Sequence, residues 1–151
     1  MEIMFKEINQ SNYKSCVELG VKSEQRNFVA PNWYSLLESY YEEGERHPLG
    51  IYKGDQMVGF IMYVFYPADE DYQLDSWWIE RFMIGDQYQN QGLGKTALKE
   101  FLDYFKSEYG KVELRISMEP HNNVALSLYE KVGFIRTGEM VENEAVLCME
   151  V

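Results

Sequence analysis

A polar turn containing two glycines constrains this 151-residue chain more than any other feature. It follows a run with strand-like alternation and precedes a run with the apolar spacing of an amphipathic helix. Glycine has no Cβ, so the main chain can approach an anion closely, and the free N–H groups at a helix N-terminus favour negative charge. The turn therefore predicts a phosphorylated cofactor. Its residues are Gln89, Asn90, Gln91, Gly92, Leu93, Gly94, Lys95 and Thr96.

Two common phosphate-binding motifs match this turn in part. A P-loop requires a glycine five residues before the glycine of its Gly-Lys-Thr, and Gln89 stands there instead. The dinucleotide-binding fingerprint matches residues 92–97, and Glu119 follows at about the 20-residue distance of a ribose-binding acid. In that fold, however, the first glycine follows its strand directly, whereas residues 86–91 intervene here. This insertion favours a third class of phosphate-binding turn.

The pattern Gln89-x-x-Gly92-x-Gly94 resembles the acetyl-CoA pyrophosphate loop of the GNAT N-acetyltransferase superfamily. A second segment, residues 122–134, resembles that superfamily's Asn-x-x-Ala-x-x-Leu-Tyr-x-x-x-Gly-Phe block. Both segments occur in the superfamily's order, with a predicted helix and a predicted strand between them. The resemblance implies acetyl-CoA as the cofactor and transfer of its acetyl group to a primary amine by direct attack on the thioester.

The apolar spacing along the chain is typical of an α/β protein. It predicts strands over residues 2–8, 49–53, 56–66, 77–84, 112–118, 134–138 and 145–151, and helices over residues 11–20, 31–43, 93–108 and 122–132. This order implies an α/β sandwich with a mixed, mostly antiparallel sheet flanked by helices, and the resemblance implies that residues 1–151 form a single N-acetyltransferase domain. It is also the element order of the GNAT sandwich.

The net charge of the chain limits the classes of ligand that it is expected to bind. The formal net charge is −11 and the isoelectric point is about 4.6, which argues against nucleic acid or an anionic membrane and favours a small cationic ligand. No long apolar run and no signal-peptide pattern occur, so we expect a cytoplasmic protein. The cysteines and histidines are isolated in sequence and predict no metal site.

Glu80 stands out in the strand predicted over residues 77–84. Strict alternation places it on one face with Trp78, Phe82 and Ile84, so that a carboxylate lies in an apolar row. Such a carboxylate either pairs with a neighbouring strand or has a chemical role, because burying it alone is costly. The similarity to diamine acetyltransferases of the superfamily implies the second, with Glu80 as general base.

The second motif supplies further candidates. Tyr129 shares a helix face with apolar residues, which is typical of a core tyrosine, but the resemblance implies a general acid for the leaving CoA thiolate. Asn122 is either a helix cap or, by resemblance, a ligand of the pantetheine arm. Lys131 is either a solvated charge or a CoA phosphate ligand. The resemblance also implies cofactor and oxyanion contacts from the main chain of the strand at Phe82, Met83 and Ile84.

The sequence also bears on which amine is the substrate. Residues 23–32 and 77–82 are similar to segments of bacterial spermine/spermidine acetyltransferases, which implies a polyamine substrate and a possible homodimer. Acidic and aromatic side chains attract ammonium groups, so we expect a groove formed by Glu24, Tyr72, Asp75 and Trp78. An aminoglycoside, an amino acid or a protein N-terminus is the alternative acceptor. A binding module without turnover is the alternative class, and the presence of both Glu80 and Tyr129 argues against it.

Overall fold

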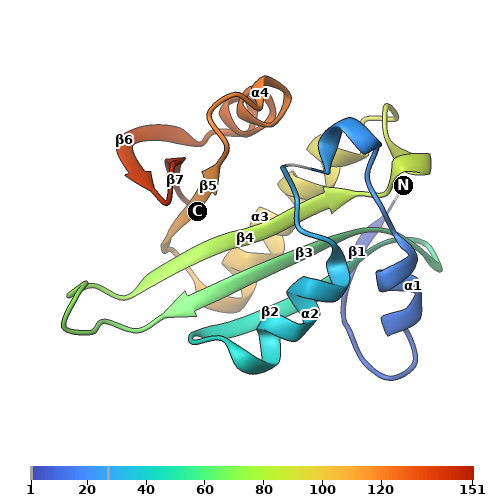
Figure 1. Ribbon diagram of the computed structural model, residues 1–151, viewed down its shortest axis with the longest axis horizontal. Coiled ribbons are helices and arrows are strands. Elements are labelled where there is room, and N and C mark those ends of the chain that lie inside the picture. The colour runs from blue at the N-terminus through green and yellow to red at the C-terminus, as the bar shows by residue number, and fades with distance from the viewer. Residues whose placement is uncertain (1, 27) are drawn as a thin grey trace.

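The computed structural model describes residues 2–26 and 28–151, and this part of the chain forms one seven-stranded sheet (Figure 1). The strand order is β1-β2-β3-β4-β5-β7-β6. Among these neighbours β4 and β5 run parallel, and the other pairs run antiparallel. The predicted α/β class and mixed, mostly antiparallel sheet are therefore confirmed. The strands are β1 (Ile3–Glu7), β2 (Glu45–Lys53), β3 (Gln56–Tyr66), β4 (Ser76–Ile84), β5 (Glu113–Met118), β6 (Ile135–Val141) and β7 (Glu144–Glu150).

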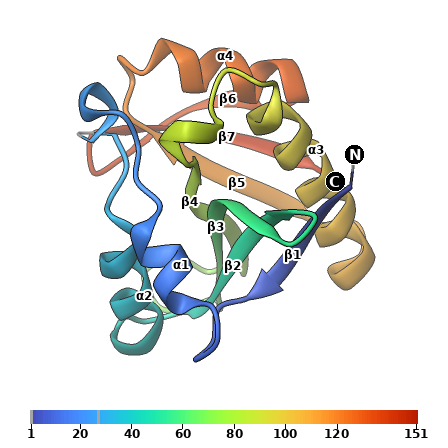
Figure 2. The same cartoon turned by 90° about the vertical axis from the view of Figure 1, so that its right-hand side faces the viewer.

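Helices cover both faces of the sheet. The helical segments are α1 (Tyr13–Glu18), η1 (Ser23–Gln25), α2 (Asn32–Tyr41), η2 (Asp86–Tyr88), α3 (Leu93–Tyr109) and α4 (Asn123–Val132). The view in Figure 2 places α1 and α2 on one face and α3 and α4 on the other. The short 3-10 turns η1 and η2 are additions to the predicted element order. Within residues 2–26 and 28–151, no helix is long and apolar enough to cross a membrane.

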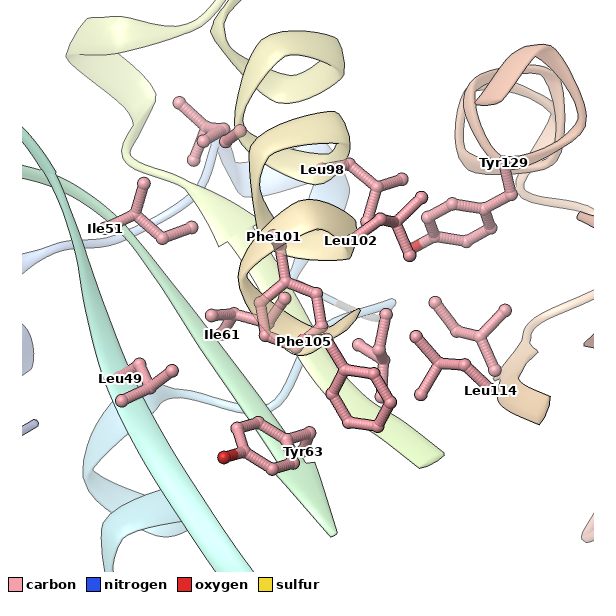
Figure 3. Close-up of a cluster of buried hydrophobic side chains, with 14 of the residues drawn as sticks. Leu49, Ile51, Ile61, Tyr63, Leu98, Phe101, Leu102, Phe105, Leu114 and Tyr129 are labelled. Atoms are coloured by element: carbon pink, nitrogen blue, oxygen red, sulfur yellow. The ribbon is translucent and has the colours of Figure 1, made fainter. Parts of the chain in front are cut away.

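The larger apolar core lies between the sheet and α3 (Figure 3). Phe101 and Phe105 of α3 are fully buried there. The ring of Tyr63 from β3 lies against both, with centroid distances of 5.7 and 5.6 Å. A smaller core on the opposite face includes Cys16 of α1 and Met83 of β4. Because β4 contributes to both cores, its position in the middle of the sheet is fixed from both sides.

The parallel contact between β4 and β5 is short. Trp77, Trp78 and Ile79 pair with residues 114–116, but β4 continues to Ile84 and β5 continues to Met118 without further pairing between them. In this described region the two strands therefore separate beyond Ile79. Main-chain groups on the β5-facing edge of the later part of β4 are left for another partner.

A β-bulge in β4 lies at the point of separation. Met62 of β3 pairs with Arg81, but the next residue, Tyr63, pairs with Ile79, so Glu80 is the additional residue. A bulge bends the strand and re-aims its side chains, and bulges are common next to active sites.

The bulge overturns the predicted alternation. Phe82 and Ile84 contact the α3-side core together with Ile79, whereas Glu80 reaches Arg46 and Tyr66 on the α2 side. The predicted face that joined Trp78, Glu80, Phe82 and Ile84 is therefore wrong, because a period of two holds only up to the extra residue.

Two hairpins extend further than their apolar patterns predicted. β2 begins at Glu45 and includes Pro48, whose missing N–H costs nothing because β1 ends opposite Leu49. β6 continues past Gly138 to Val141, since that glycine forms an irregularity in the strand rather than its end. The β6–β7 turn consists of Glu142 and Asn143, with φ values of 49° and 66°, which are typical of a two-residue hairpin turn.

Candidate active site

A cleft of about 960 Å³ opens where β4 and β5 separate. It is lined by the ends of both strands, the segment around η1, the beginning of α3, α4, and the β6–β7 turn. A second hollow of about 540 Å³ near α1 and η2 contains none of the predicted catalytic or cofactor-binding residues. The larger cleft is therefore the candidate active site.

The predicted phosphate-binding turn borders this cleft. Asn90 and Gly92 adopt left-handed conformations, with φ values of 62° and 75°, and Gly92 is the N-cap residue of α3. Within the described chain no side chain caps the first turn of α3, so its N–H groups remain available to an anion. A side chain at Gly92 would strain the left-handed backbone, which explains the glycine at this position.

Gln89 lines the cleft and also fixes the turn through its side-chain amide. Its Nε2 donates to the main-chain oxygen of Ile84 at 2.9 Å. Its amide also pairs reciprocally with Gln25 of η1, with N–O distances of 3.2 and 2.9 Å. The turn is thereby tied both to the end of β4 and to the segment between α1 and α2.

The predicted cofactor residues divide into two groups. Those that line the cleft are Phe82, Met83, Ile84, Gln89, Asn90, Gly92, Leu93, Gly94 and Asn122. Those outside its lining are Gln91, Lys95, Thr96 and Lys131. The Thr96 hydroxyl donates to the Gly92 oxygen at 3.0 Å, which supports the turn from within the helix. The Lys131 side chain lies in an exposed position in the last turn of α4.

Asn122 caps α4. Its side-chain oxygen accepts a hydrogen bond from the Ala125 N–H at 3.2 Å, which satisfies one of the first-turn donors. Asn122 also lines the cleft, so the capping role leaves its amide group beside the space in which a ligand arm would lie. Cap and ligand contact, which the sequence presented as alternatives, are compatible in this geometry.

Tyr129 projects from α4 into the α3-side core, where Figure 3 shows its ring. The residue is 8% exposed, and it also lines the cleft. Burial raises the pKa of the Tyr129 hydroxyl, and the negative charge of Glu144 raises it further. The hydroxyl is therefore held in its neutral, proton-bearing form beside the cleft.

Glu80 lies in a polar network on the α2 side of β4. Its Oε2 accepts from Nη1 of Arg46 and its Oε1 accepts from the Tyr66 hydroxyl. Nη2 of Arg46 also donates to Tyr66 at 2.9 Å. The side chain of Arg46 is 6% exposed and that of Glu80 is 22% exposed. Burial raises the pKa of Tyr66, and its hydrogen bond to Glu80 raises it further. Of the two possibilities that the sequence left open, the structure shows the partnered carboxylate.

The predicted substrate residues are not brought together. Glu24 lines the cleft, but Tyr72, Asp75 and Trp78 do not. Asp75 instead accepts from the Ala68 N–H at 2.8 Å within the β3–β4 loop. The ring of Trp78 lies beneath the Arg115 guanidinium at 5.9 Å. These three residues precede or begin β4, whereas the cleft lies at the end of that strand.

The sequence prediction missed the contribution of the β6–β7 hairpin. Glu142 and Glu144 line the cleft, and Glu144 accepts a hydrogen bond from the Ser117 hydroxyl of β5 at 2.9 Å. Asn143 is a residue type that favours hairpin turns, and this was the available signal. It was overlooked because the predicted strand ended at Gly138.

This arrangement matches a known family. The family model for the acetyltransferase (GNAT) family matches residues 7–134, which is most of the chain. The chain belongs to this family. It is an acetyl-CoA-dependent N-acetyltransferase, as the motif resemblance predicted.

Relatives of known identity agree with this assignment. Over the full length of both chains, the sequence is 31% identical to the spermine/spermidine N(1)-acetyltransferase of Bacillus subtilis (strain 168). A PaiA N-acetyltransferase from Thermoplasma acidophilum, solved in complex with coenzyme A, has a TM-score of 0.69 at 16% identity, with 100% of both chains covered. A spermidine N-acetyltransferase from Vibrio cholerae, solved with CoA and spermine, has a TM-score of 0.71 at 14% identity, with 99% of this chain and 94% of that chain covered. These two structures share the fold.

The residues at the turn fit acetyl-CoA. The uncapped α3 N-terminus suits its pyrophosphate, and the unpaired edge of β4 suits its pantetheine arm. A Cβ added at Gly94 would meet Leu128 Cδ2 at 3.8 Å and Ile84 Cγ1 at 3.9 Å, which are ordinary contact distances. Gly94 therefore leaves open a space between α3, α4 and β4 that the fold itself does not fill.

This open space leads to a prediction for Gly94→Leu. We expect the variant to fold, because leucine favours a helix more than glycine does, but to bind acetyl-CoA at least about tenfold more weakly because the side chain enters the cleft. Isothermal titration calorimetry measures the affinity, and Gly20→Leu is the control, since a Cβ there meets nothing within 4 Å. If folded Gly94→Leu bound acetyl-CoA with unchanged affinity, the assignment of the cofactor to this turn would be wrong.

Proposed function

We propose that this enzyme acetylates a primary amine of a polyamine such as spermidine or spermine. The observation that carries the proposal is the 31% identity to a spermine/spermidine N(1)-acetyltransferase over the full length of both chains. The charge of the cleft supports it. Acidic side chains in the lining are Glu24, Glu80, Glu119, Glu142 and Glu144, and basic ones are Lys22, Arg26 and Arg81.

The basic side chains offset this acidity only in part. Arg81 is already paired, because its Nη2 donates to Glu38 at 3.0 Å. Glu24 and Glu142 are exposed and come from different elements that line the cleft, the η1 segment and the β6–β7 turn. We expect these two residues to attract the distal ammonium groups of a polyamine. Distal placement matters, because a carboxylate beside the reacting ammonium stabilises its charged form.

When bound, acetyl-CoA supplies a thioester carbonyl that is activated toward amines. An alkylammonium has a pKa of about 10.4, so a group of the enzyme has to accept its proton before the nitrogen can attack. Alternate main-chain N–H groups between Phe82 and Ile84 lie on the strand edge that is free of β5, where they are proposed to stabilise the carbonyl oxygen. The neutral Tyr129 hydroxyl is proposed to protonate the leaving sulfur.

A polyamine should be acetylated with a higher kcat/KM than a monoamine of equal length. Each exposed charge pair contributes up to about 1 kcal/mol, so we expect a preference of up to about fivefold for each distal ammonium. Release of CoA thiol measures the rate for a panel of amines. Raising the ionic strength should reduce the preference, because exposed charges are screened over about 8 Å at physiological salt.

Substitutions of Glu24 and Glu142 test whether these residues contact the distal ammonium groups of the substrate. Glu24→Gln and Glu142→Gln should each reduce the polyamine preference, whereas Glu100→Gln on the exposed surface of α3 should not change it. Equal efficiency for polyamine and monoamine at low salt would reject the polyamine proposal. A strong preference for an amino acid, an aminoglycoside or a peptide N-terminus would redirect it to that acceptor.

A further inference from the structure

The two half-buried carboxylates that line the cleft from the sheet have different surroundings. Both oxygens of Glu80 are engaged, one by the guanidinium of Arg46 and one by the Tyr66 hydroxyl. A carboxylate paired with a buried cation is a poor proton acceptor, because protonation would leave that cation without its counter-charge. Both oxygens of Glu80 therefore already have partners, so its geometry suits a structural ion pair better than contact with a substrate amine.

Glu144 is held in place by a hydrogen bond, but its charge is not paired with a cation in the described part of the chain. Its Oε1 accepts one hydrogen bond from the Ser117 hydroxyl at 2.9 Å, and in residues 2–26 and 28–151 it forms no ion pair. It is half-buried at the first position of β7, on a strand that is paired on both sides. The carboxylate thus has a defined position and retains free acceptor capacity.

Glu144 also lies near the proposed proton donor. Both Glu144 and Tyr129 line the cleft, and the charge of Glu144 is close enough to raise the pKa of the Tyr129 hydroxyl. Protonation of Glu144 would remove that charge and make Tyr129 a better acid. The other ionisable side chains lining the cleft, apart from Glu80, are Lys22, Glu24, Arg26, Arg81, Glu119 and Glu142.

We propose that Glu144, rather than Glu80, accepts the proton of the attacking amine. The ammonium N–H bond breaks and the proton bonds to a Glu144 oxygen. The freed nitrogen lone pair forms the bond to the acetyl carbon. As the C–S bond breaks, the sulfur takes the Tyr129 proton, and a second N–H bond of the attached nitrogen breaks and releases its proton to solvent water, which leaves the neutral amide. Transfer of the proton from Glu144 to the Tyr129 phenolate then restores both groups.

The proposal rests on acetyl transfer to an amine and does not depend on which amine is the substrate. Its test therefore uses whichever amine the wild-type enzyme acetylates with the highest kcat/KM. If that amine is not a polyamine, the proposed substrate class fails and the test of Glu144 proceeds unchanged.

Glu144→Gln should lower kcat about 100-fold at neutral pH, while the affinity for acetyl-CoA stays unchanged. The pH profile provides the decisive measurement. Without its proton acceptor the variant depends on amine that is already neutral, so its rate should rise about tenfold per pH unit from pH 7 toward the amine pKa of about 10.4. The wild-type rate should level off instead. If Glu144 had only a packing role, its substitution would lower the rate by the same factor at every pH.

Three further variants complete the test. Glu150→Gln, the same change at the exposed far end of β7, should leave both rate and profile unaltered. Glu144→Asp retains a carboxylate and should keep the levelled profile even at reduced rate, which covers the case in which the glutamine variant folds poorly. Glu80→Gln should also keep the levelled profile. If Glu80→Gln shows the steep profile and Glu144→Gln does not, the proposal is overturned in favour of Glu80.

Discussion

Tyr129→Phe should lower kcat by about 10²- to 10⁴-fold, which is the usual contribution of a general acid or base. The substitution removes one hydroxyl and keeps the ring, so its contact with Phe134, at a centroid distance of 6.1 Å, should remain. Acetyl-CoA affinity should therefore be retained. Single-turnover kinetics should reveal the loss in the chemical step.

The raised pKa of Tyr129 adds a pH dependence with a defined sign. Because its pKa lies above the usual value of about 10, the hydroxyl stays neutral throughout the neutral range, and its ionisation should cause no loss of activity below about pH 10. The associated stability is fully present below that unfolded-state value and is lost as the pH rises through the higher folded-state value. Tyr129→Phe should therefore weaken alkaline denaturation above about pH 10.

Tyr63 provides the matched control for this prediction. Its hydroxyl is also buried, at 2.6 Å from that of Tyr109, but it lies outside the cleft lining. Tyr63→Phe should change stability by about 1 kcal/mol and leave kcat unaffected. A similar kcat for Tyr129→Phe and wild type, with chemistry rate-limiting, would return Tyr129 to a purely structural role.

Arg46→Met should destabilise the protein by about 3 kcal/mol. The Arg46 side chain is 6% exposed, and its removal leaves Tyr66 as the one partner of the Glu80 carboxylate among residues 2–26 and 28–151. Removing one partner of a buried pair costs about 3 to 5 kcal/mol, and the partial exposure of Glu80 places the expected value at the lower end. Urea denaturation measures the free energy of unfolding.

Two variants separate the charge effect from lost packing. Arg46→Met combined with Glu80→Leu should recover most of the stability, because no unpaired charge remains. Arg115→Met should cost less than about 1 kcal/mol, since its partners Glu113 and Glu139 are 47% and 56% exposed. Equal losses for Arg46→Met and Arg115→Met would mean that solvent screens the Glu80 pair as well.

The sequence alone was sufficient to predict those features of the fold and the site that depend on a local motif. The glycines at 92 and 94 mark the predicted turn, and in the structure Gly92 adopts a left-handed backbone. The helix that follows begins at Leu93, as its apolar spacing predicted. The element order was equally accessible, because each strand and helix has its own period.

Features that depend on pairing between strands were not accessible in this way. The bulge at Glu80 appears only in the register with β3, and it separates that carboxylate from Phe82 and Ile84, with which it was predicted to share a face. Likewise, Glu144 becomes a cleft residue only because β7 pairs with β5 and places it beside Ser117. Tyr72 and Asp75 were included in the predicted groove because they lie close to β4 in sequence, but they precede the strand, whereas the cleft is lined by its later part, from Ile79 to Ile84.

The short parallel contact between β4 and β5 also bears on how the molecule assembles. Strands β1 to β4 are joined by antiparallel pairings, and β2, β3 and β4 pair in chain order. β5 reaches β4 only after α3 has crossed the sheet, and loop-closure entropy makes such non-local pairing slow. We therefore expect the antiparallel N-terminal strands to order first and the junction at residues 77–79 and 114–116 to form late. The cleft opens at the end of that junction, so an intermediate that lacks the junction also lacks the catalytic site.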